Sequence, residues 1–240
     1  FSSTKNECIV LNGEIYGFLD LKKKYTNYPY KGTSDTEVIL AMYQQKGTEL
    51  ITELPGMFAF AIWDEQKKEL FCARDRFGEK PFYYTIGKNG EFIFSSEIKA
   101  ILATDLVKPE VSQEALSHFL QYGYVSSQQT IYKNIHTLPP AHTLQFSDGK
   151  ISIKRYYKIP EKDRKIGLSE AKEEFTFLLK NAIEKQLIAD VEVGSFLSGG
   201  LDSSTIVAMV NEFTKKQATI SFGYFGDHNE LKFADEIAQK

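Results

Sequence analysis

The chain contains Ser198-Gly199-Gly200-Leu201-Asp202-Ser203-Ser204 between a strand-like run, Val193 to Leu197, and a helix-like stretch, Thr205 to Glu212. This order predicts a strand, then a glycine turn, then the start of a helix. Such a turn points free backbone N–H groups at one spot, beside the positive end of the helix dipole. The two glycines let an anion approach the backbone closely, and the serine hydroxyls add donors. The loop therefore predicts a phosphate or pyrophosphate site. It has no Lys and is not the G-x-x-x-x-G-K-S/T type of phosphate loop.

Asp202 is the unusual residue of this loop, because a carboxylate repels phosphates unless a cation lies between them. Mg²⁺ bound by the carboxylate and the phosphates would reconcile the two charges. The alternative is an ordinary glycine-serine turn in which Asp or Ser only caps the helix.

Composition excludes several classes of protein. The 240 residues are 42% hydrophobic and 25% charged, which suits one large domain or two modest ones. A net charge of −3 does not favour a nucleic-acid partner, and the longest apolar run, Met57 to Trp63, is too short to cross a membrane. Two cysteines, Cys8 and Cys72, make neither a disulfide framework nor a metal site. We expect both to be small buried hydrophobes in a reducing compartment, and hence a cytoplasmic protein.

The first half of the chain has the pattern of strands joined by turns. Asn12-Gly13 is a strong turn signal after the apolar run Ile9 to Leu11, and Met57 to Trp63 predicts a strand covered on both faces. Sheets covered in this way, with helices outside, predict a layered sandwich. Further expected elements are a helix from Glu37 to Lys46, a hairpin from Pro81 to Ile86 and Glu91 to Ser95, and a helix from Gln113 to Gln121 that buries Ala115, Leu116, Phe119 and Leu120.

The pattern changes after a Pro-containing, charged stretch from Ile159 to Gly167, which is the best linker candidate. Ser169 can cap a long helix. The strand before the serine-rich loop, the helix after it and a second strand from Ala218 to Gly223 make a β-α-β unit, which predicts a parallel sheet. The chain starts at Phe1 and stops within a periodic helical pattern, so we expect a fragment of a longer protein.

The serine-rich loop resembles the pyrophosphate-binding loop of the ATP-pyrophosphatase ligases, which cut ATP between its α- and β-phosphates. Several further motifs occur in a fixed order, and together they closely resemble the glutamine-hydrolysing asparagine synthetases over essentially the whole chain. These motifs are Asn12-Gly13-Glu14-Ile15-Tyr16, Ser34-Asp35, Gly56-Met57-Phe58-Ala59-Phe60-Ala61, Arg74-Asp75-Arg76-Phe77-Gly78-Glu79-Lys80-Pro81 and Ser95-Ser96-Glu97-Ile98-Lys99-Ala100.

The resemblance implies an α+β part followed by an α/β part. Residues 1–158 would form a class II glutamine amidotransferase domain, an αββα four-layer sandwich of the N-terminal-nucleophile hydrolase kind. Residues 168–240 would begin a Rossmann-like, parallel-sheet ATP-pyrophosphatase domain. The implied reaction converts aspartate, glutamine and ATP into asparagine, glutamate, AMP and pyrophosphate through β-aspartyl-AMP. The implied cofactors are ATP and Mg²⁺, and a homodimer is left open.

The resemblance also implies roles for particular residues. Asn12 and Gly13 would form the oxyanion hole, and Glu14 and Asp35 would hold the α-ammonium and main-chain groups of glutamine. ATP would contact Leu197, Phe222 and the loop residues Ser198, Gly199, Gly200, Leu201, Asp202, Ser203 and Ser204, with Asp202 toward Mg²⁺.

Simpler interpretations of the same residues stay open. Asn12-Gly13 could be a hairpin turn, Asp35 a helix cap and Phe222 a core residue. Arg74 and Asp75 are expected to brace the fold as a partly buried pair.

The sequence departs from the family pattern at the nucleophile. The family uses a cysteine at the mature N-terminus. Phe1 cannot replace it, and Cys8 lies on the strand that leads to Asn12. We therefore expect this chain alone to be inactive. The rival interpretations are a related ATP-dependent ligase with another carboxylate acceptor, and a non-catalytic metabolite-sensing module.

Overall fold

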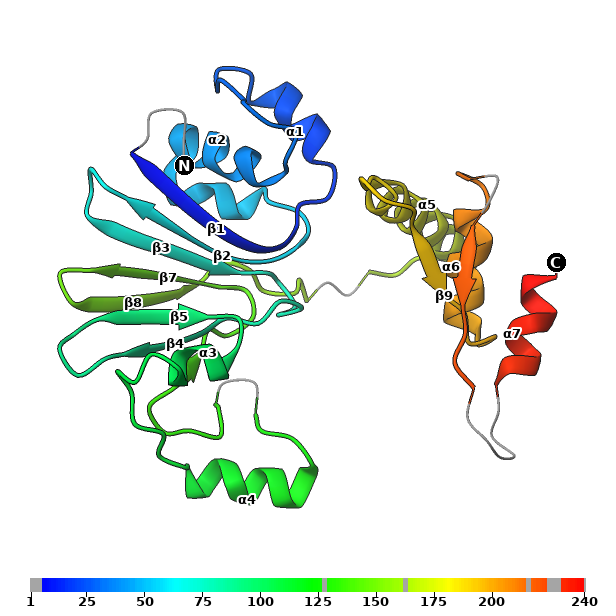
Figure 1. The fold of residues 1–240 in the computed structure, drawn as a ribbon. Coiled ribbons are helices and arrows are strands. Elements are labelled where there is room, and N and C mark those ends of the chain that lie inside the picture. Colours follow the sequence, from blue (N-terminus) through cyan, green and yellow to red (C-terminus); the bar gives the residue numbers. More distant parts are fainter. Residues whose placement is uncertain (1–5, 127–128, 162–163, 215–216, 224–229, 240) are drawn as a thin grey trace. The chain divides into compact units, whose positions relative to one another are not determined.

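The computed structural model describes residues 6–126, 129–161, 164–214, 217–223 and 230–239. The chain divides into two compact units, residues 1–161 and residues 162–240. Within the described residues the first unit contains two antiparallel sheets, and the second contains a pair of parallel strands (Figure 1).

The larger sheet of the first unit has the strand order β1-β2-β3-β7-β8, with β1 at its edge. All neighbouring strands in it are antiparallel. The predicted strand with both faces covered is confirmed in β2, which is almost entirely buried. The strands are β1 (Glu7–Glu14), β2 (Met57–Asp64), β3 (Glu69–Arg74), β7 (His142–Ser147) and β8 (Lys150–Arg155).

The smaller sheet has the order β5-β4-β6. Its strands are β4 (Tyr83–Ile86), β5 (Phe92–Ser95) and β6 (His136–Thr137). The predicted hairpin is confirmed, because β4 and β5 pair antiparallel around the Gly87–Gly90 turn.

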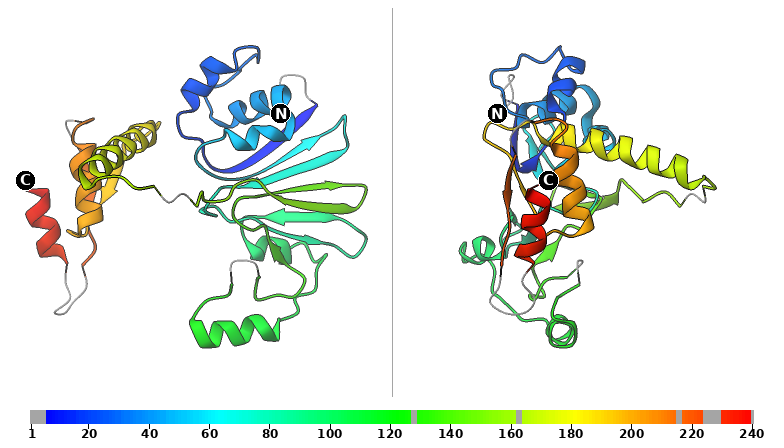
Figure 2. Two further views of the ribbon diagram at one scale, coloured as in Figure 1. Left: turned by 180° about the vertical axis from the view of Figure 1, so that it is seen from behind. Right: turned by 90° about the vertical axis from the view of Figure 1, so that its right-hand side faces the viewer.

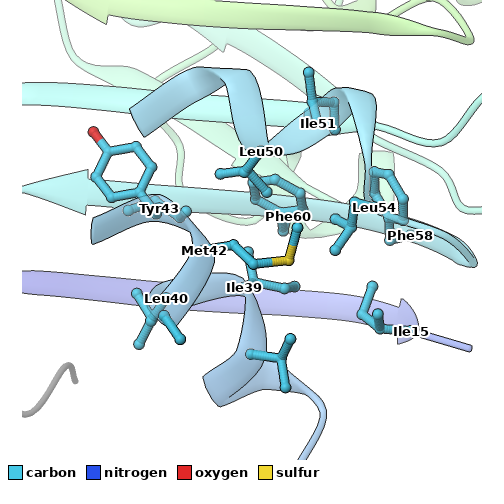
Figure 3. Close-up of a cluster of buried hydrophobic side chains, with 14 of the residues drawn as sticks. Ile15, Ile39, Leu40, Met42, Tyr43, Leu50, Ile51, Leu54, Phe58 and Phe60 are labelled. Atoms are coloured by element: carbon cyan, nitrogen blue, oxygen red, sulfur yellow. The ribbon is translucent and has the colours of Figure 1, made fainter. Parts of the chain in front are cut away.

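Helices cover the outer face of the larger sheet. These are α1 (Phe18–Lys24), α2 (Thr36–Lys46) and the 3-10 helix η1 (Gly47–Thr52). Figure 3 shows that the side chains of α2 and η1 meet those of β2, with Met42 and Leu50 beside Phe60. Burial of large apolar side chains at this contact, each contributing about 1.5–3 kcal/mol, fixes the helices on the sheet.

Two further apolar layers complete the first unit. Between the sheets, Cys72 and Leu144 of the larger sheet lie in one cluster with Phe82. On the far side of the smaller sheet, Ile101 of α3 (Ile98–Leu102) packs with Ile135. The order is therefore helices, sheet, sheet and helices, as the two opposite views in Figures 1 and 2 show. The four-layer αββα prediction is confirmed.

Helix α4 (Gln113–Tyr122) begins where it was predicted, and the Ser112 hydroxyl accepts the N–H of Ala115 as an N-cap. Ala115 is buried, but Leu120 is 76% exposed and Phe119 is 49% exposed. The prediction that these two side chains point inward was wrong. Helical spacing identifies an apolar stripe but does not show what covers it.

In the second unit β9 (Gly194–Phe196) and β10 (Ala218–Ile220) pair in parallel, and α6 (Leu201–Val210) connects them within the described residues. The predicted β-α-β unit is confirmed, although its helix starts four residues earlier than the apolar pattern indicated. Helix α5 (Leu168–Gln186) starts before Ser169, so Ser169 is not its cap; Gly167 takes that position. The last helix is α7 (Leu231–Ala238). No helix in the described part of the chain is long and apolar enough to span a membrane.

Candidate functional site

Asn12 and Gly13 lie inside strand β1 and do not form a turn. They pair with Ala59 and Phe58 of β2, and the strand continues to Glu14. The hairpin-turn interpretation was therefore wrong. Gly13 has φ of +147°, and a Cβ atom at this position would lie 2.1 Å from the Met57 carbonyl oxygen. The glycine is required by a close approach of two strands rather than by a reversal of the chain.

The backbone N–H of Gly13 points to the open edge of the sheet. Phe58 lies directly opposite Gly13, and its backbone N–H and carbonyl point away from β1. The Phe58 carbonyl accepts the Asp75 N–H at 2.8 Å, and the Phe58 N–H donates to the Asp75 carboxylate at 3.3 Å. Opposite residues of an antiparallel pair either bond to each other or both point away. The Gly13 N–H therefore points away from β2, toward the edge of β1 that has no neighbouring strand among the described residues.

A pocket of about 210 Å³ opens where β1 and β2 approach the end of β5. Its walls are mostly apolar, formed by side chains such as Ala59, Phe82 and Phe94. Asn12, Ser95 and Ser96 are the polar side chains among its lining residues. A small apolar hollow with a few polar groups at one end is typical of a small-molecule site.

The side-chain amide of Asn12 donates to the Ser96 hydroxyl at 3.0 Å. This bond joins residues 84 positions apart and links the edge of the larger sheet to the end of β5. Ser96 belongs to one of the motifs that carried the family resemblance, but sequence reasoning assigned it no role. No local signal could have found it, because the contact depends on how the two sheets pack.

Asp35 is directed at the same edge of β1. One carboxylate oxygen accepts the Ile15 N–H at 2.9 Å, and the side chain makes no capping bond to helix α2. Asp35 does stand at the N-cap position of α2, but its side chain caps no N–H of that helix, so the interpretation of Asp35 as an ordinary side-chain cap was wrong. Ile15 directly follows β1 and lies two residues beyond Gly13, so the N–H groups of both residues face the same open edge of the sheet. The Asp35 carboxylate thus lies on the same edge as the Gly13 N–H, at the position two residues further along the chain from Gly13.

The end of β1 carries further acidic groups. Burial raises the pKa of the Tyr16 hydroxyl, and the nearby carboxylates of Glu79, Glu14 and Asp75 raise it further. Deprotonation is disfavoured because it would add negative charge beside carboxylates. Glu14, which was predicted to hold the ammonium group of glutamine, therefore contributes to a negative field at this end of the strand.

Arg74 and Asp75 brace the loop that follows β3 but do not form the expected pair; no ion pair joins them among the described residues. The Asp75 side chain, in a residue only 1% exposed, accepts backbone N–H groups of Phe58, Phe77, Glu79 and Lys80. Arg74 donates to carbonyl oxygens, including that of Leu138 at 2.8 Å. Each charge is satisfied by the backbone, so both residues have a structural role.

Neither cysteine of the chain lines the pocket. Cys8 is partly buried on β1, and Cys72 lies within the core between the sheets. Burial raises the pKa of the Cys72 thiol, which keeps it protonated and unreactive.

In the second unit, the serine-rich loop connects β9 to α6, and hydrogen bonds of its own serine hydroxyls hold its two ends together. The Ser203 hydroxyl accepts the Ser198 N–H at 3.2 Å and lies 3.0 Å from the Ser198 hydroxyl. Gly199 has φ of +80°, and its Cβ would lie 2.5 Å from that of Phe233. Among the described residues no acceptor is found for the N–H groups of Leu201 and Asp202, at the positive end of α6.

The predicted nucleotide residues around this loop differ in their surroundings. Leu197 is 2% exposed, and its N–H donates to the Ile220 carbonyl at 2.9 Å, so its side chain belongs to the core. Phe222 is 69% exposed with its ring 5.6 Å from that of Phe196, so the interpretation of Phe222 as a core residue was wrong. Asp202 lies exposed in the first turn of α6.

The described residues contain no group of three or more His, Cys, Asp or Glu side chains placed to hold a metal ion. One exposed carboxylate beside free N–H groups still fits Mg²⁺, because this ion is commonly held by one or two carboxylates together with substrate phosphates.

Comparison with known families assigns the first unit. Residues 1–157 match the family described as the glutamine amidotransferase domain. The chain belongs to this family. The amidotransferase match ends close to the boundary between the two compact units, and residues 174–240 match the family described as asparagine synthase. The edge of β1 and the pocket beside it thus lie within the amidotransferase part, and the serine-rich loop lies within the second match.

Several curated relatives are named asparagine synthetase (glutamine-hydrolyzing). A Methanocaldococcus jannaschii protein, provisionally named asparagine synthetase (glutamine-hydrolyzing) 2, is 42% identical over 94% of this chain and 44% of its own length. Asparagine synthetase (glutamine-hydrolyzing) 3 and 1 of Bacillus subtilis are 39% and 35% identical, over 92% and 90% of this chain. The chain covers only 37% and 34% of those two proteins, so it spans less than half of each of these relatives.

Among solved structures, a glutamine phosphoribosylpyrophosphate amidotransferase from B. subtilis, complexed with ADP and GMP, matches with a TM-score of 0.46 and 18% identity. The match covers 92% of this chain and 47% of that chain.

Proposed function

We propose that this chain carries the glutamine pocket and the ATP-pyrophosphate loop of a glutamine-dependent asparagine-forming ligase. The observation that carries the proposal is the edge of β1, where the Gly13 N–H is open and the Asp35 carboxylate bonds the next N–H on the same side. The names of the relatives support the same conclusion.

The spacing along this edge suits a free amino acid. Two residues of a strand span about 6.8 Å, which is comparable with the reach of an extended glutamine from its side-chain amide to its α-ammonium group. We infer that the amide lies at Asn12 and Gly13 and the ammonium group at Asp35 and Glu14. Charge-assisted contacts of this kind let the site bind glutamine in preference to an amide that has no α-ammonium group.

Hydrolysis then needs donors for the charge that develops on the amide oxygen. A thiolate adds to the amide carbon, and the nitrogen takes up the proton that the thiol gave up. The C–N bond then breaks and ammonia leaves. Water hydrolyses the thioester, which releases glutamate and returns the thiol. The Asn12 amide and the Gly13 N–H would stabilise the tetrahedral oxyanion. We assign the nucleophile to a residue outside this sequence, because neither cysteine of the chain lines the pocket.

The second unit would supply ATP chemistry. The N–H groups at the start of α6 and the loop hydroxyls would bind the β- and γ-phosphates that leave as pyrophosphate. Asp202 would hold Mg²⁺, which neutralises phosphate charge. Phe222, exposed beside the carboxyl ends of the parallel strands, would contact the nucleotide. Aspartate would then be activated as β-aspartyl-AMP and attacked by ammonia.

The test uses the whole protein, meaning the polypeptide that carries this chain together with the segments its longer relatives possess. Incubation with aspartate, glutamine and ATP should yield asparagine, AMP and pyrophosphate in equal amounts. Asp35→Asn should raise the KM for glutamine while leaving the ammonia-dependent reaction unchanged, because ammonia does not use the glutamine pocket. The exposed Asp20→Asn variant is the matched control.

Three results would contradict the proposal. ADP and phosphate as products would exclude a pyrophosphate-releasing loop. Equal use of glutamine and N-acetylglutamine, which has no ammonium group, would remove the role of Asp35 and Glu14. Formation of AMP only with another carboxylate acceptor would point to the related ligase instead.

A further inference from the structure

Ser96 occupies a position from which it can control the orientation of the Asn12 amide. The Asn12 nitrogen donates to the Ser96 hydroxyl at 3.0 Å, in a partly buried contact at the pocket. Ser96 follows the end of β5, and the neighbouring Ser95 hydroxyl accepts the Glu97 N–H at 3.1 Å, which fixes the turn into α3. The hydroxyl is therefore held by secondary structure of the opposite sheet.

An asparagine amide has two N–H groups, one oxygen and a broad rotation about its last bond. Without a partner, it can place its oxygen where its nitrogen should be. Ser96 engages one N–H, so the second N–H is left for the pocket. The other pocket walls are mainly apolar and offer few groups that could compete for it.

We propose that Ser96 is a positioning residue for glutamine hydrolysis: it holds the Asn12 amide with its free N–H ready for the oxyanion. This inference rests on the proposed glutaminase function. Ser96 acts only through Asn12. Holding the amide in place matters because a donor that must reorient during the reaction loses the advantage of preorganisation. Its effect should appear in the transition state and not in the binding of glutamine.

The test is a double-mutant cycle in the whole protein, with glutaminase kinetics as the readout. Asn12→Ala should lower kcat by about 10²–10³. Ser96→Ala should lower kcat by about tenfold with little change in the KM for glutamine, as expected for the loss of one hydrogen bond. The double variant should be no slower than Asn12→Ala alone. Ser96→Thr, which keeps the hydroxyl, should restore most of the rate.

A ligand pair separates positioning from a general structural effect. Glutamate γ-semialdehyde, which forms a tetrahedral adduct with the nucleophile, should bind Ser96→Ala about tenfold more weakly, whereas the affinity for L-glutamate should not change. Ser117→Ala, on the exposed side of α4, is the matched serine control.

The outcomes are distinguishable from a failure of the proposed function. An unchanged kcat in Ser96→Ala, or additive losses in the double variant, would overturn the inference while leaving glutamine hydrolysis intact. A wild-type protein that hydrolyses no glutamine would overturn the function itself. The side-chain ¹⁵N–¹H NMR signals of Asn12 test the Asn12–Ser96 hydrogen bond directly. If this bond exists, Ser96→Ala should shift one of the two N–H resonances.

Discussion

At the scale of single residues, Gly13 is placed where no other amino acid fits. Its φ of +147° is unfavourable for any residue with a Cβ, and that atom would lie 2.7 Å from the Phe58 Cα as well as against the Met57 carbonyl. Both contacts are with backbone, which cannot move without separating β1 from β2.

We expect Gly13→Ala to destabilise the protein by more than about 2 kcal/mol, because it adds backbone strain and a steric clash. Urea unfolding measures the change. Gly90→Ala is the control: its φ is +89°, but nothing lies within 4 Å of the added atom, so the cost should be near 1 kcal/mol. Equal losses in the two variants would show that the β1–β2 contact is looser than described.

At the scale of elements, Glu53 connects the ends of three helices. It follows η1 and forms ion pairs with Lys24, the last residue of α1, at 2.7 Å, and with Lys46, the last residue of α2. The Tyr25 hydroxyl also donates to it at 3.1 Å. These partners, Lys24 first, lower the pKa of the Glu53 carboxyl from 4.5 to about 2.

This shift predicts a pH dependence of stability. Because the folded-state pKa lies below the unfolded value, the stabilisation is complete above about pH 4.5 and is lost as the pH falls toward about 2. Glu53→Gln should therefore lower the urea midpoint at pH 7, and the difference from wild type should shrink between pH 4.5 and pH 2.

The control removes both cations. In a Lys24→Met, Lys46→Met background, Glu53→Gln should give the same small difference at every pH. A wild-type difference that does not change with pH would refute the charged contact. High salt should also weaken the effect, because the groups are accessible to solvent.

At the scale of the whole molecule, the two compact units differ in what they bury. Among the residues that the structure describes, the first has three apolar clusters that separate four layers. The described part of the second has one small cluster, formed by Leu197, Val207 and Ala234 with Ile237 packed against it. Its helices leave large apolar side chains exposed, among them Phe175 and Leu178 of α5 and Leu201 of α6.

We expect residues 1–161 expressed alone to unfold in one cooperative transition, since their described part holds two sheets and the three apolar clusters between the layers. Residues 164–240 alone should be marginally stable, because a two-stranded sheet needs cover that the unit does not supply to itself. Circular dichroism during urea titration of each piece measures both. A sharp, stable transition in the second piece would contradict this account.

The sequence by itself determined the kind and order of most elements. Burial of β2, the β4–β5 hairpin and the parallel pair around the serine-rich loop follow from local hydrophobic periodicity and turn residues, which act over a few positions. The ordered motifs also determined the family. Local patterns misplaced Asn12-Gly13 in a turn, Ser169 at a cap, and Phe119 and Leu120 in the core.

Only the tertiary structure decided the geometry of the site. The Asn12–Ser96 bond joins positions 84 residues apart, and the bond from Ile15 to Asp35 crosses 20 residues. The open direction of the Gly13 N–H depends on the strand register, in which Phe58 turns toward Asp75. Such contacts depend on register and on the packing of two sheets, and neither is encoded in the residues nearest to the site.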